Sequence, residues 1–543
     1  NEWTYNGSSK KITMYSAGTP VNVKIPTVEE AVNLGSKDYI TFDNLNFQGY
    51  NTNGINTTSR TGIRVQNCAF SFIGVNAVYA YPNSNNLKVT ASTFTDCGSR
   101  AIHGGSSSNA VISGNTLLRI GHFAGMGSSG DDSFTGIIAN GDNSEVSYNN
   151  ITNVGYCGIR WDGNSTVIKG NFVNTTNYIK DDGGGIYCYP VQYGNTAHTQ
   201  ATRTVRDNIV LNSVGAPDGS PYGKQGMGIY MDGQSPNIRL IHNSVSGGVL
   251  GIFINGGHDI YCDSNTTYNF INGYYLLKIG GPVDNETVTN NIFVAAGAAS
   301  SSCGSGAYPA NFQPGASSMP SSFTASKNIY ARPLDQSNGW IFSIMGSNQC
   351  RTLAQWQSAT GKDAGSVSSP LTTNNASNLR FEYNETASPK TISLGATYID
   401  MKNVSYPGNI TLPPFSSAVL LKTGAASNIT PSANAGADIT INLPTVIATL
   451  SGSGTDPDGS IASYSWTKIS GPTGVITNVT SAITTITSLL QGTYLFELKV
   501  TDNAGAIGRD TVKVTVNPLG NTAPTANAGA DQVITLPTST VSL

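Results

Sequence analysis

The chain has 543 residues, a formal net charge of −3 and only 11% charged residues. This charge offers no electrostatic basis for binding nucleic acid or an anionic membrane surface. The sequence contains no run of about 18 apolar residues, so we expect no helical membrane span. Gly, Asn, Ser and Thr are abundant, and Gly and Asn tolerate the dihedrals of tight turns. The composition therefore favours short strands joined by turns over helices.

The first and last residues of the chain both lie within patterned sequence. The chain opens on the strand-like segment Trp3–Tyr5 and stops at Leu543 inside a repeated pattern. No secretory leader is visible at Asn1. We therefore expect this sequence to be part of a longer protein whose leader and first coils precede residue 1.

A repeat organises about the first 300 residues. Each unit reads as strand, turn, strand and then a Gly-Ile or Ala-Ile strand, as at 158–162, 228–232 and 251–255. One such unit cannot bury its apolar face alone, but stacked coils bury a continuous core. The pattern predicts an all-β chain that begins as a right-handed parallel β-helix, with turn asparagines forming side-chain ladders between coils. The repeating asparagines are Asn67, Asn115, Asn150, Asn171, Asn208, Asn243, Asn265 and Asn291.

The Gly-Ile strands predict which side chains face solvent. Aligned on Gly158, Gly185, Gly228 and Gly251, the first and third residues after each Gly are apolar and should point inward. The second and fourth should point outward, and Tyr79, Tyr81 and His103 continue their row. Exposed tyrosines offer flat apolar faces with hydroxyl groups, which suit sugars. The outward set is Arg160, Asp162, Tyr187, Tyr189, Tyr230, Asp232, Phe253 and Asn255.

These residues predict a glycan-binding cleft. Three repeat units contain extra residues, near 122–142, 190–202 and 215–227. We expect these insertions to form loops on one face of the solenoid and to make the walls of the cleft. The alternative is a face that the loops cover, so that the aromatic rings serve packing alone. We expect Arg160, Asp162, Tyr187, Tyr189, Tyr230 and Asn255 to bind substrate, together with His122 and His258, while His242 is a further candidate.

Two carboxylates are candidates for cleaving a glycosidic bond, which needs one acid and one nucleophile or base. Asp162 and Asp232 share a register two coils apart, at roughly 10 Å. Asp182 precedes three glycines that let the backbone bend toward Asp232. Close carboxylates raise one another's pKa, so that one can stay protonated. We select Asp182 and Asp232 as the catalytic pair, with turn roles as the alternative and Asp181 as a supporting residue.

The cysteines predict no metal site. Cys68, Cys97, Cys157, Cys188 and Cys262 lie in apolar strand patterns, as buried small residues do. Cys303 and Cys350 lie in irregular sequence and could pair. No cysteine spacing resembles a zinc site, and we expect no required cofactor.

Asp182-Gly-Gly-Gly-Ile-Tyr187 and Gly228-Ile-Tyr-Met-Asp232 resemble a signature of glycoside hydrolase family 141, Asp-Gly-Gly-Ala-Ile-Tyr … Gly-Ile-Tyr-Leu-Asp-Asp. The opening Asn1–Tyr5 and the segment 40–45 also resemble the early coils of that family. The resemblance covers roughly residues 1–300 and implies a β-helix with fucosidase-like or xylanase-like activity. It also implies that Asp182 and Asp232 are the catalytic pair. This chain departs from the signature at Gly185 and at Gly233, where the family has Ala and a second Asp.

We expect four parts along the chain: the β-helix with its closing segment (1–375), a small β-sandwich (376–425), a second sandwich (426–518) and the start of its repeat (519–543). After the β-helix, alternating strand patterns separated by turn residues about every ten residues predict β-sandwiches. Asp456-Pro-Asp-Gly459 and the repeated Ala-Asn-Ala-Gly-Ala-Asp motif resemble polycystic-kidney-disease-type (PKD), Ig-like domains. Such domains act as spacers or glycan-binding stalks on secreted bacterial proteins. Their aspartates are candidates for binding Ca²⁺, with a turn role as the alternative.

The leading hypothesis is a secreted or cell-surface hydrolase whose partner is a complex extracellular polysaccharide. A polysaccharide lyase is the enzymatic alternative, because β-helices host lyases as well. It would need a basic residue such as Arg160, Lys180 or Lys224. The third alternative is a non-catalytic adhesin, or a protein of an extracellular fibre or matrix.

Overall fold

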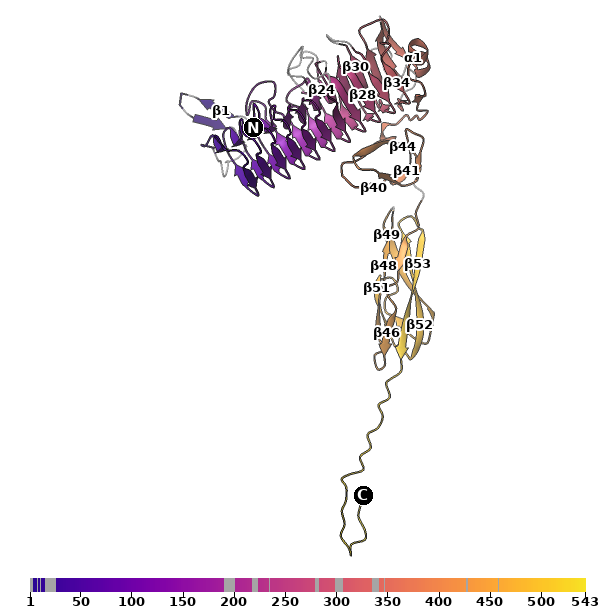
Figure 1. Ribbon diagram of the computed structural model, residues 1–543. Helices are drawn as coiled ribbons and strands as arrows, with labels where there is room; N and C mark the ends of the chain where they lie inside the picture. The colour runs from indigo at the N-terminus through magenta and orange to yellow at the C-terminus, as the bar shows by residue number, and fades with distance from the viewer. Residues whose placement is uncertain are drawn as a thin grey trace. The chain divides into compact units, whose positions relative to one another are not determined.

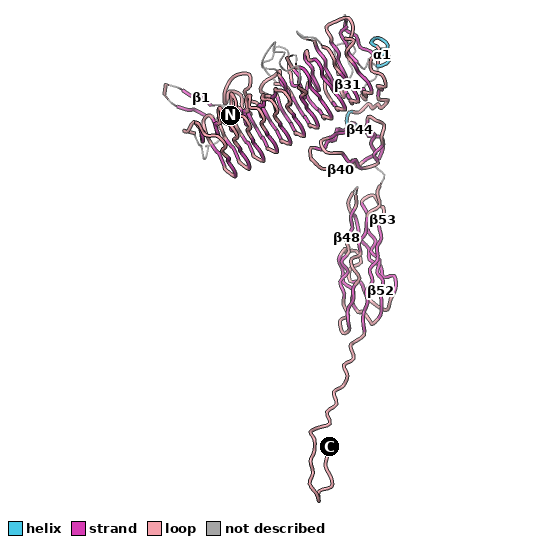
Figure 2. The backbone as a smooth tube through the Cα atoms, viewed as in Figure 1, coloured by secondary structure: helices cyan, strands magenta, loops and turns pink. Residues whose placement is uncertain are grey.

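The computed structural model describes residues 3–6, 8–9, 11–14, 26–189, 201–216, 223–233, 235–278, 283–297, 306–334, 341–345, 347–425, 428–457 and 459–543. Strands and turns make up these residues, apart from helix α1 (Leu353–Thr360) and a 3₁₀ turn at Ala376–Asn378 (Figure 2). The chain divides into two compact units. The first unit is Asn1–Ile392, Thr397–Tyr406 and Ile410–Gly424, and the second is Ser393–Ala396, Pro407–Asn409 and Ala425–Leu543. Within the described residues, no helix combines the length and apolar character that a membrane span requires.

The first unit is a solenoid of stacked coils, and successive strands along the chain join three different parallel sheets (Figure 1). Sheet 1 contains β3 (Glu30–Asn33), β6 (Asn53–Asn56), β9 (Asn76–Tyr79), β12 (Arg100–His103), β15 (Ile137–Ala139), β18 (Ile159–Trp161), β21 (Gly183–Cys188), β24 (Gly226–Met231), β27 (Leu250–Asn255), β30 (Asn272–Leu277), β33 (Tyr308–Gln313), β36 (Ile341–Met345) and the antiparallel β37 (Ser347–Arg351).

Sheet 2 contains β4 (Thr41–Asp43), β7 (Arg64–Gln66), β10 (Lys88–Thr90), β13 (Val111–Ser113), β16 (Glu145–Ser147), β19 (Val167–Lys169), β22 (Arg203–Arg206), β25 (Pro236–Ile241), β28 (His258–Asp263), β31 (Thr287–Thr289) and β34 (Thr324–Ser326). Sheet 3 contains β5 (Asn46–Gln48), β8 (Ala69–Ser71), β11 (Thr93–Thr95), β14 (Thr116–Ile120), β17 (Asn150–Val154), β20 (Phe172–Thr176), β23 (Ile209–Ser213), β26 (Ser244–Gly248), β29 (Thr266–Tyr268), β32 (Ile292–Val294), β35 (Ile329–Ala331) and β38 (Val367–Ser368). The predicted parallel β-helix is confirmed.

The core of the solenoid runs along its axis as stacked rows of apolar side chains. Ile159 pairs with Ile186, Ile186 with Ile229, and Ile229 with Ile252, and all four side chains are fully buried. Arg160, Tyr187, Tyr230 and Phe253 form the adjacent row in the same register. Strand side chains alternate between faces, so this second row points away from the core, as the Gly-Ile alignment predicted. The expected exposure of the row was wrong, because its four side chains are buried, at 2–8% exposure, and the three aromatic ones pack in a cluster of their own.

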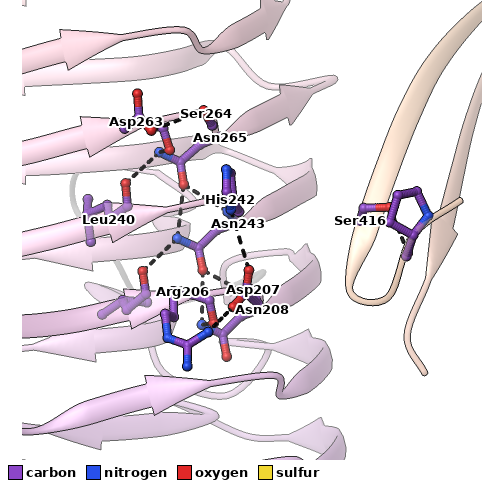
Figure 3. Close-up of polar contacts among 12 residues, drawn as sticks. Arg206, Asp207, Asn208, Leu240, His242, Asn243, Asp263, Ser264, Asn265 and Ser416 are labelled. Carbon is purple, nitrogen blue, oxygen red and sulfur yellow. Dashed lines mark hydrogen bonds and ion pairs between the residues drawn. The ribbon is translucent and has the colours of Figure 1, made fainter. Parts of the chain in front are cut away.

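A ladder of buried asparagine side chains fixes the turn between sheets 2 and 3. Each amide nitrogen donates to the side-chain oxygen of the next asparagine, at 2.9–3.0 Å, and a backbone carbonyl in the preceding coils accepts a second bond (Figure 3). The ladder ends on the buried carboxylate of Asp363, which also accepts from Trp356 Nε1. The members are Asn115, Asn149, Asn171, Asn208, Asn243, Asn265, Asn291 and Asn328.

The predicted set of ladder residues was wrong at two coils. Asn149, not its neighbour Asn150, belongs to the ladder, because Asn150 begins β17 and is exposed. Asn67 lies in the left-handed turn position before the ladder. Cys68 takes the ladder position in that coil, and Ser92 takes it in the next coil. The pattern Asn-apolar alone does not separate these adjacent positions.

Asn243→Ala should lower the free energy of unfolding of the β-helix by about 2 kcal/mol. The substitution removes one donor to the buried Oδ1 of Asn265 and the acceptor of the buried Asn208 backbone N–H, and such losses cost about 1–3 kcal/mol. Urea unfolding followed by circular dichroism measures the change. Asn150→Ala is the matched control, and an equal loss in the two variants would contradict a special role for the ladder.

A small sandwich follows the solenoid and packs on the outward face of sheet 3. Its strands are β39 (Leu379–Asn384), β40 (Lys390–Ser393), β41 (Ala396–Asp400), β42 (Ser405–Tyr406), β43 (Asn409–Leu412) and β44 (Ser416–Ala425). The ring of Phe381 stacks on Tyr268 of β29 at 5.6 Å, and Tyr383 stacks on Phe172 of β20 at 5.9 Å. Met401 and Val419 join Val294 in a shared apolar cluster.

The second unit contains another sandwich with its own core around Trp466, Tyr494 and Leu498. Its strands are β45 (Ser432–Asn434), β46 (Ile439–Asn442), β47 (Ala448–Ser451), β48 (Ser453–Thr455), β49 (Ile461–Ser470), β50 (Val475–Ile476), β51 (Ile483–Thr487), β52 (Gly492–Asp502) and β53 (Ile507–Asn517). Residues 519–543, which we expected to begin another repeat, contain no strand in this structure.

Candidate functional site

A groove of about 880 Å³ lies on the outward face of sheet 1. Its floor is a row of rings from four successive coils: Tyr187, Tyr230, Phe253 and Tyr275. Neighbouring ring centroids are 5.1, 4.7 and 4.8 Å apart along this row. Because each coil adds one ring, the row forms a continuous apolar strip along the axis of the solenoid.

The loop between β14 and β15 forms one wall. Lys180 Nζ donates to the carbonyls of Gly130 and Asp131, and Arg160 forms an ion pair with Asp132. These contacts fix the first predicted insertion against the groove. The other two predicted walls lie largely outside the described residues, at 190–200 and 217–222, although Lys224 and Gln225 of the third line the groove.

Asp232 is held in one orientation at the groove by three donors. The Tyr187 hydroxyl donates to Oδ2 at 2.9 Å, while the Asn255 amide and the Gly233 backbone N–H donate to Oδ1 at 2.8 and 2.7 Å. Asp232 follows β24 directly, and Tyr187 and Asn255 come from the strands on either side of it. The stacking of coils therefore brings the donors to this carboxylate.

Asp182 also lines the groove and precedes β21. Its backbone is in the left-handed region (φ 57°), and its carbonyl accepts from the Tyr156 hydroxyl at 2.8 Å. Gly183 permits this approach, because a Cβ there would lie 2.4 Å from the Tyr156 ring. The Tyr230 hydroxyl donates to Asp182 Oδ1 at 3.4 Å. Asp182 thus receives a bond from the floor of the groove.

The environment of Asp182 favours its protonated form. Although the residue is exposed as a whole, loss of solvent around its carboxyl and the charge of Asp232 raise the pKa of Asp182 above its usual value. The hydrogen bond from Tyr230 opposes this shift, and the charge of Asp181 adds to it. Asp181 itself accepts backbone N–H groups from Ala216 and Gln225, at 2.6 and 3.1 Å, and so supports the wall.

Most of the predicted site residues line this one groove. They are Asp182, Asp232, Arg160, Tyr187, Tyr189, Tyr230 and Asn255. The described lining does not include Asp162, His122 or His258. His122 Nδ1 is 2.7 Å from the Tyr178 hydroxyl, and His258 Nδ1 is 2.7 Å from Asp259 Oδ2 on sheet 2.

Asp162 points into the solenoid rather than toward the groove. Its Oδ1 lies 2.7 Å from Nη1 of Arg203, whose side chain is fully buried over the ring of Trp161. Strand β18 ends at Trp161, so the alternation of faces no longer applies at the next residue. The predicted outward orientation of Asp162 was therefore wrong.

The alignment on Gly also missed two groove residues that it could have found. Gly273 begins one further coil of the same pattern, in which Tyr274 and Leu276 are buried and Tyr275 and Leu277 line the groove. Tyr156 and Asp131 also line the groove, but they come from a turn and a loop that no strand period describes.

The structure shows a turn role for one aspartate of the sandwich in the second unit. Asp502 Oδ1 accepts the backbone N–H groups of Ala504 and Ala506, both at 2.9 Å, and Oδ2 accepts from Asn428. Asp458 lies outside the described residues. Among the residues that the structure does describe, no cluster of His, Cys, Asp or Glu is suited to hold a metal ion. Calcium binding by this domain stays a prediction.

The predicted pairing of Cys303 with Cys350 also lies outside the described residues, because Cys303 is not among them. Cys68, Cys97, Cys157, Cys188 and Cys262 are free and buried.

Comparison with known families supports both halves of the architecture. The family model of the right-handed beta helix region matches residues 30–189, and that of the PKD domain of KIAA0319-like proteins matches residues 435–516. The chain is a right-handed parallel β-helix followed by a PKD domain. Membership of glycoside hydrolase family 141 is not shown by these matches.

Among curated proteins, the mouse dyslexia-associated protein KIAA0319-like protein is 39% identical over 118 residues, which are 22% of this chain and 11% of that protein. Human low-density lipoprotein receptor-related protein 11 is 40% identical over 87 residues, 16% of this chain and 17% of that protein. The chain thus spans less than a fifth of the length of either relative.

Among solved structures, the tailspike protein of E. coli bacteriophage HK620, solved with a pentasaccharide, is 11% identical, with a TM-score of 0.35 over 72% of this chain and 74% of that chain. The PKD domain from the KIAA 1837 protein is 33% identical, with a TM-score of 0.17 over 19% of this chain and 100% of that chain.

Proposed function

We propose that the groove of sheet 1 binds a polysaccharide and that Asp182 and Asp232 hydrolyse a glycosidic bond in it. The observation that carries this proposal is that two carboxyl groups share one aromatic groove but have different environments. Glycoside hydrolysis needs such a pair, with one group protonated and the other ionised.

Asp182 is the general acid in this mechanism. Its raised pKa favours the protonated form, which a general acid needs to protonate the leaving oxygen of the scissile bond. Asp232 is the nucleophile or the base that activates water, and Tyr187 and Asn255 are the positioning residues that orient its carboxylate. Sugar rings lie against the aromatic floor, with their hydroxyl groups toward Arg160 and Tyr189 at one end. Because large polysaccharides lie outside cells, we place this activity in a secreted or cell-surface protein.

The experiment that tests the proposal is a screen of the full chain against soluble plant and algal polysaccharides, with reducing-end assays and product separation. We expect new reducing ends on at least one substrate, without absorbance from unsaturated sugars. Reducing ends absent from every substrate, with binding retained, would instead support the non-catalytic adhesin.

A lyase is the second candidate, and one observation favours it. Burial lowers the pKa of Lys180, which moves this groove residue toward the range of a base. However, Lys180 Nζ donates to two carbonyls of the wall, and these contacts hold its protons away from the floor. Unsaturated products absorbing in the ultraviolet would identify a lyase.

Tyr230→Phe should move the alkaline limb of the pH–activity profile to higher pH. The acid Asp182 must be protonated, so activity falls as pH rises through its pKa. The Tyr230 hydroxyl bonds to the ionised carboxyl and lowers that pKa, and removing the bond raises it. The measurement is the pH at which the alkaline limb of the kcat/KM profile falls, independent of the maximal kcat/KM of the variant.

Tyr156→Phe is the matched control for this prediction. The Tyr156 hydroxyl donates to the backbone carbonyl of Asp182 and not to its carboxyl. We expect the limb of this variant to stay closer to that of the unmodified protein. A limb that moves to lower pH in Tyr230→Phe would contradict the assignment of Asp182 as the acid.

A further inference from the structure

A second concavity lies where the small sandwich meets the solenoid, on sheet 3 rather than sheet 1. It has a volume of about 260 Å³, and its lining includes Tyr148, Asn150, Phe172, Glu385 and Phe415. All of these residues belong to the first compact unit. The cavity shares no lining residue with the groove.

Two aromatic side chains form its mouth. The rings of Tyr148 and Phe415 are 5.7 Å apart and tilted by 43°, and Tyr148 is 50% exposed. The Tyr148 ring lies over Gly170, where a Cβ would approach it to 2.6 Å. Gly170 therefore gives the ring room to lie flat against the solenoid. On the inner side, Phe172 stacks on Tyr383.

Both mouth residues have a left-handed backbone, with φ of 56° at Tyr148 and 50° at Phe415. In the neighbouring coils the turn position of Tyr148 holds Ala91, Gly114 and Gly170, which are smaller. The left-handed backbone is a feature of this turn in other coils as well, as at Ala91, His242 and Lys327, so it is the aromatic side chain that distinguishes position 148. Two such rings at one cavity point to a use for their exposed faces.

The polar part of the lining identifies the kind of ligand. The Glu385 carboxylate, which pairs with Lys390 Nζ at 2.9 Å, and the Asn150 side chain offer hydrogen-bonding groups beside the rings. Ring faces with nearby carboxylate and amide groups suit a sugar. The volume lies below the roughly 300–1,000 Å³ of sites for drug-sized ligands. The cavity therefore matches one sugar ring.

We propose that this cavity binds a single sugar residue of a polysaccharide chain, at a site separate from the groove. Binding at two sites on one molecule raises the effective concentration of the chain at the second site, without any new contact there. The proposal does not depend on hydrolysis in the groove, because it requires binding alone.

The test is affinity electrophoresis of the full chain in native gels that contain arabinoxylan, xyloglucan, galactomannan or mixed-linkage β-glucan. We expect retardation in at least one gel, and at least tenfold weaker binding for the double variant Tyr148→Ala/Phe415→Ala. Ala91 shows that alanine is compatible with the left-handed turn at position 148. Glu385→Gln keeps the shape of the lining and should also weaken binding. This variant tests the proposal even if the double variant does not fold.

The matched control is Tyr39→Ala/Phe72→Ala. These rings are 77% and 58% exposed, and both residues are also left-handed, but neither lines the cavity. Equal weakening by both double variants would overturn the proposal, as would a Glu385→Gln variant that binds as tightly as the unmodified protein. Free migration of the unmodified protein in all four gels would also overturn it. Unchanged hydrolysis of a short oligosaccharide by the cavity variants would separate this site from the groove.

Discussion

We expect Asp182→Asn and Asp232→Asn each to lower kcat by about 10²–10⁴-fold on the substrate of the proposed hydrolysis. Asn cannot deliver a proton to the leaving oxygen at position 182, and it cannot act as nucleophile or base at position 232. Amide and carboxyl groups have nearly the same shape, so the groove should keep its affinity for the chain. Initial rates and a binding isotherm, measured on the same substrate, separate these two effects.

Asp263→Asn is the control for this pair. Asp263 lies on sheet 2, accepts from Asn290 at 2.7 Å and is not among the described groove residues. Its rate should equal that of the unmodified protein. If Asp182→Asn and Asp232→Asn cleave as fast as this control, the two carboxylates are not the catalytic pair.

Asp162→Ala should destabilise the β-helix by about 3–5 kcal/mol. The substitution removes the charge partner of Arg203, whose guanidinium is fully buried and also donates to the Pro236 carbonyl at 2.6 Å. An unpaired buried charge carries this large penalty because neither water nor a counter-charge solvates it. The shift of the β-helix transition in urea measures the change.

The double variant Asp162→Ala/Arg203→Met tests the cause of that loss. Removing both charges should restore most of the stability, because no uncompensated charge remains in the core. Glu145→Gln, in the more exposed pair with Lys169, should cost less than about 1 kcal/mol. A double variant as unstable as Asp162→Ala would show that packing at Asp162, rather than charge, dominates.

The outward row of sheet 1 shows how far strand alternation can predict a site. Within a strand the side-chain period is two, so the apolar residues beside each Gly predicted which neighbours face out. The predicted outward direction was correct at Arg160, Tyr187 and Tyr230, which lie inside strands β18, β21 and β24, but the predicted exposure was not, because all three side chains are buried. At the ends of these strands the same rule placed Asp232 correctly and Asp162 wrongly.

Asp162 and Asp232 differ because their neighbours in the adjacent coils differ. Arg203 enters the interior beside Asp162 and attracts its carboxylate inward. Tyr187 and Asn255 flank Asp232 on the outer face and hold its carboxylate there. Each of these partners is at least 20 residues away in sequence, so no local pattern contains the information.

The sequence by itself determined the stacked coils, the inward and outward rows within each strand, and the position of the two acids near one aromatic face. These features follow from periods of two residues and of one coil, which are properties of the chain itself. Only the tertiary structure decided that Asp232, and not Asp162, lies in the groove, and that the loop between β14 and β15 forms its wall. It also decided that the small sandwich encloses a second cavity against sheet 3. Those outcomes depend on contacts between side chains that are distant in sequence. The stacking of the coils determines which charged groups meet at these contacts and how deeply they are buried.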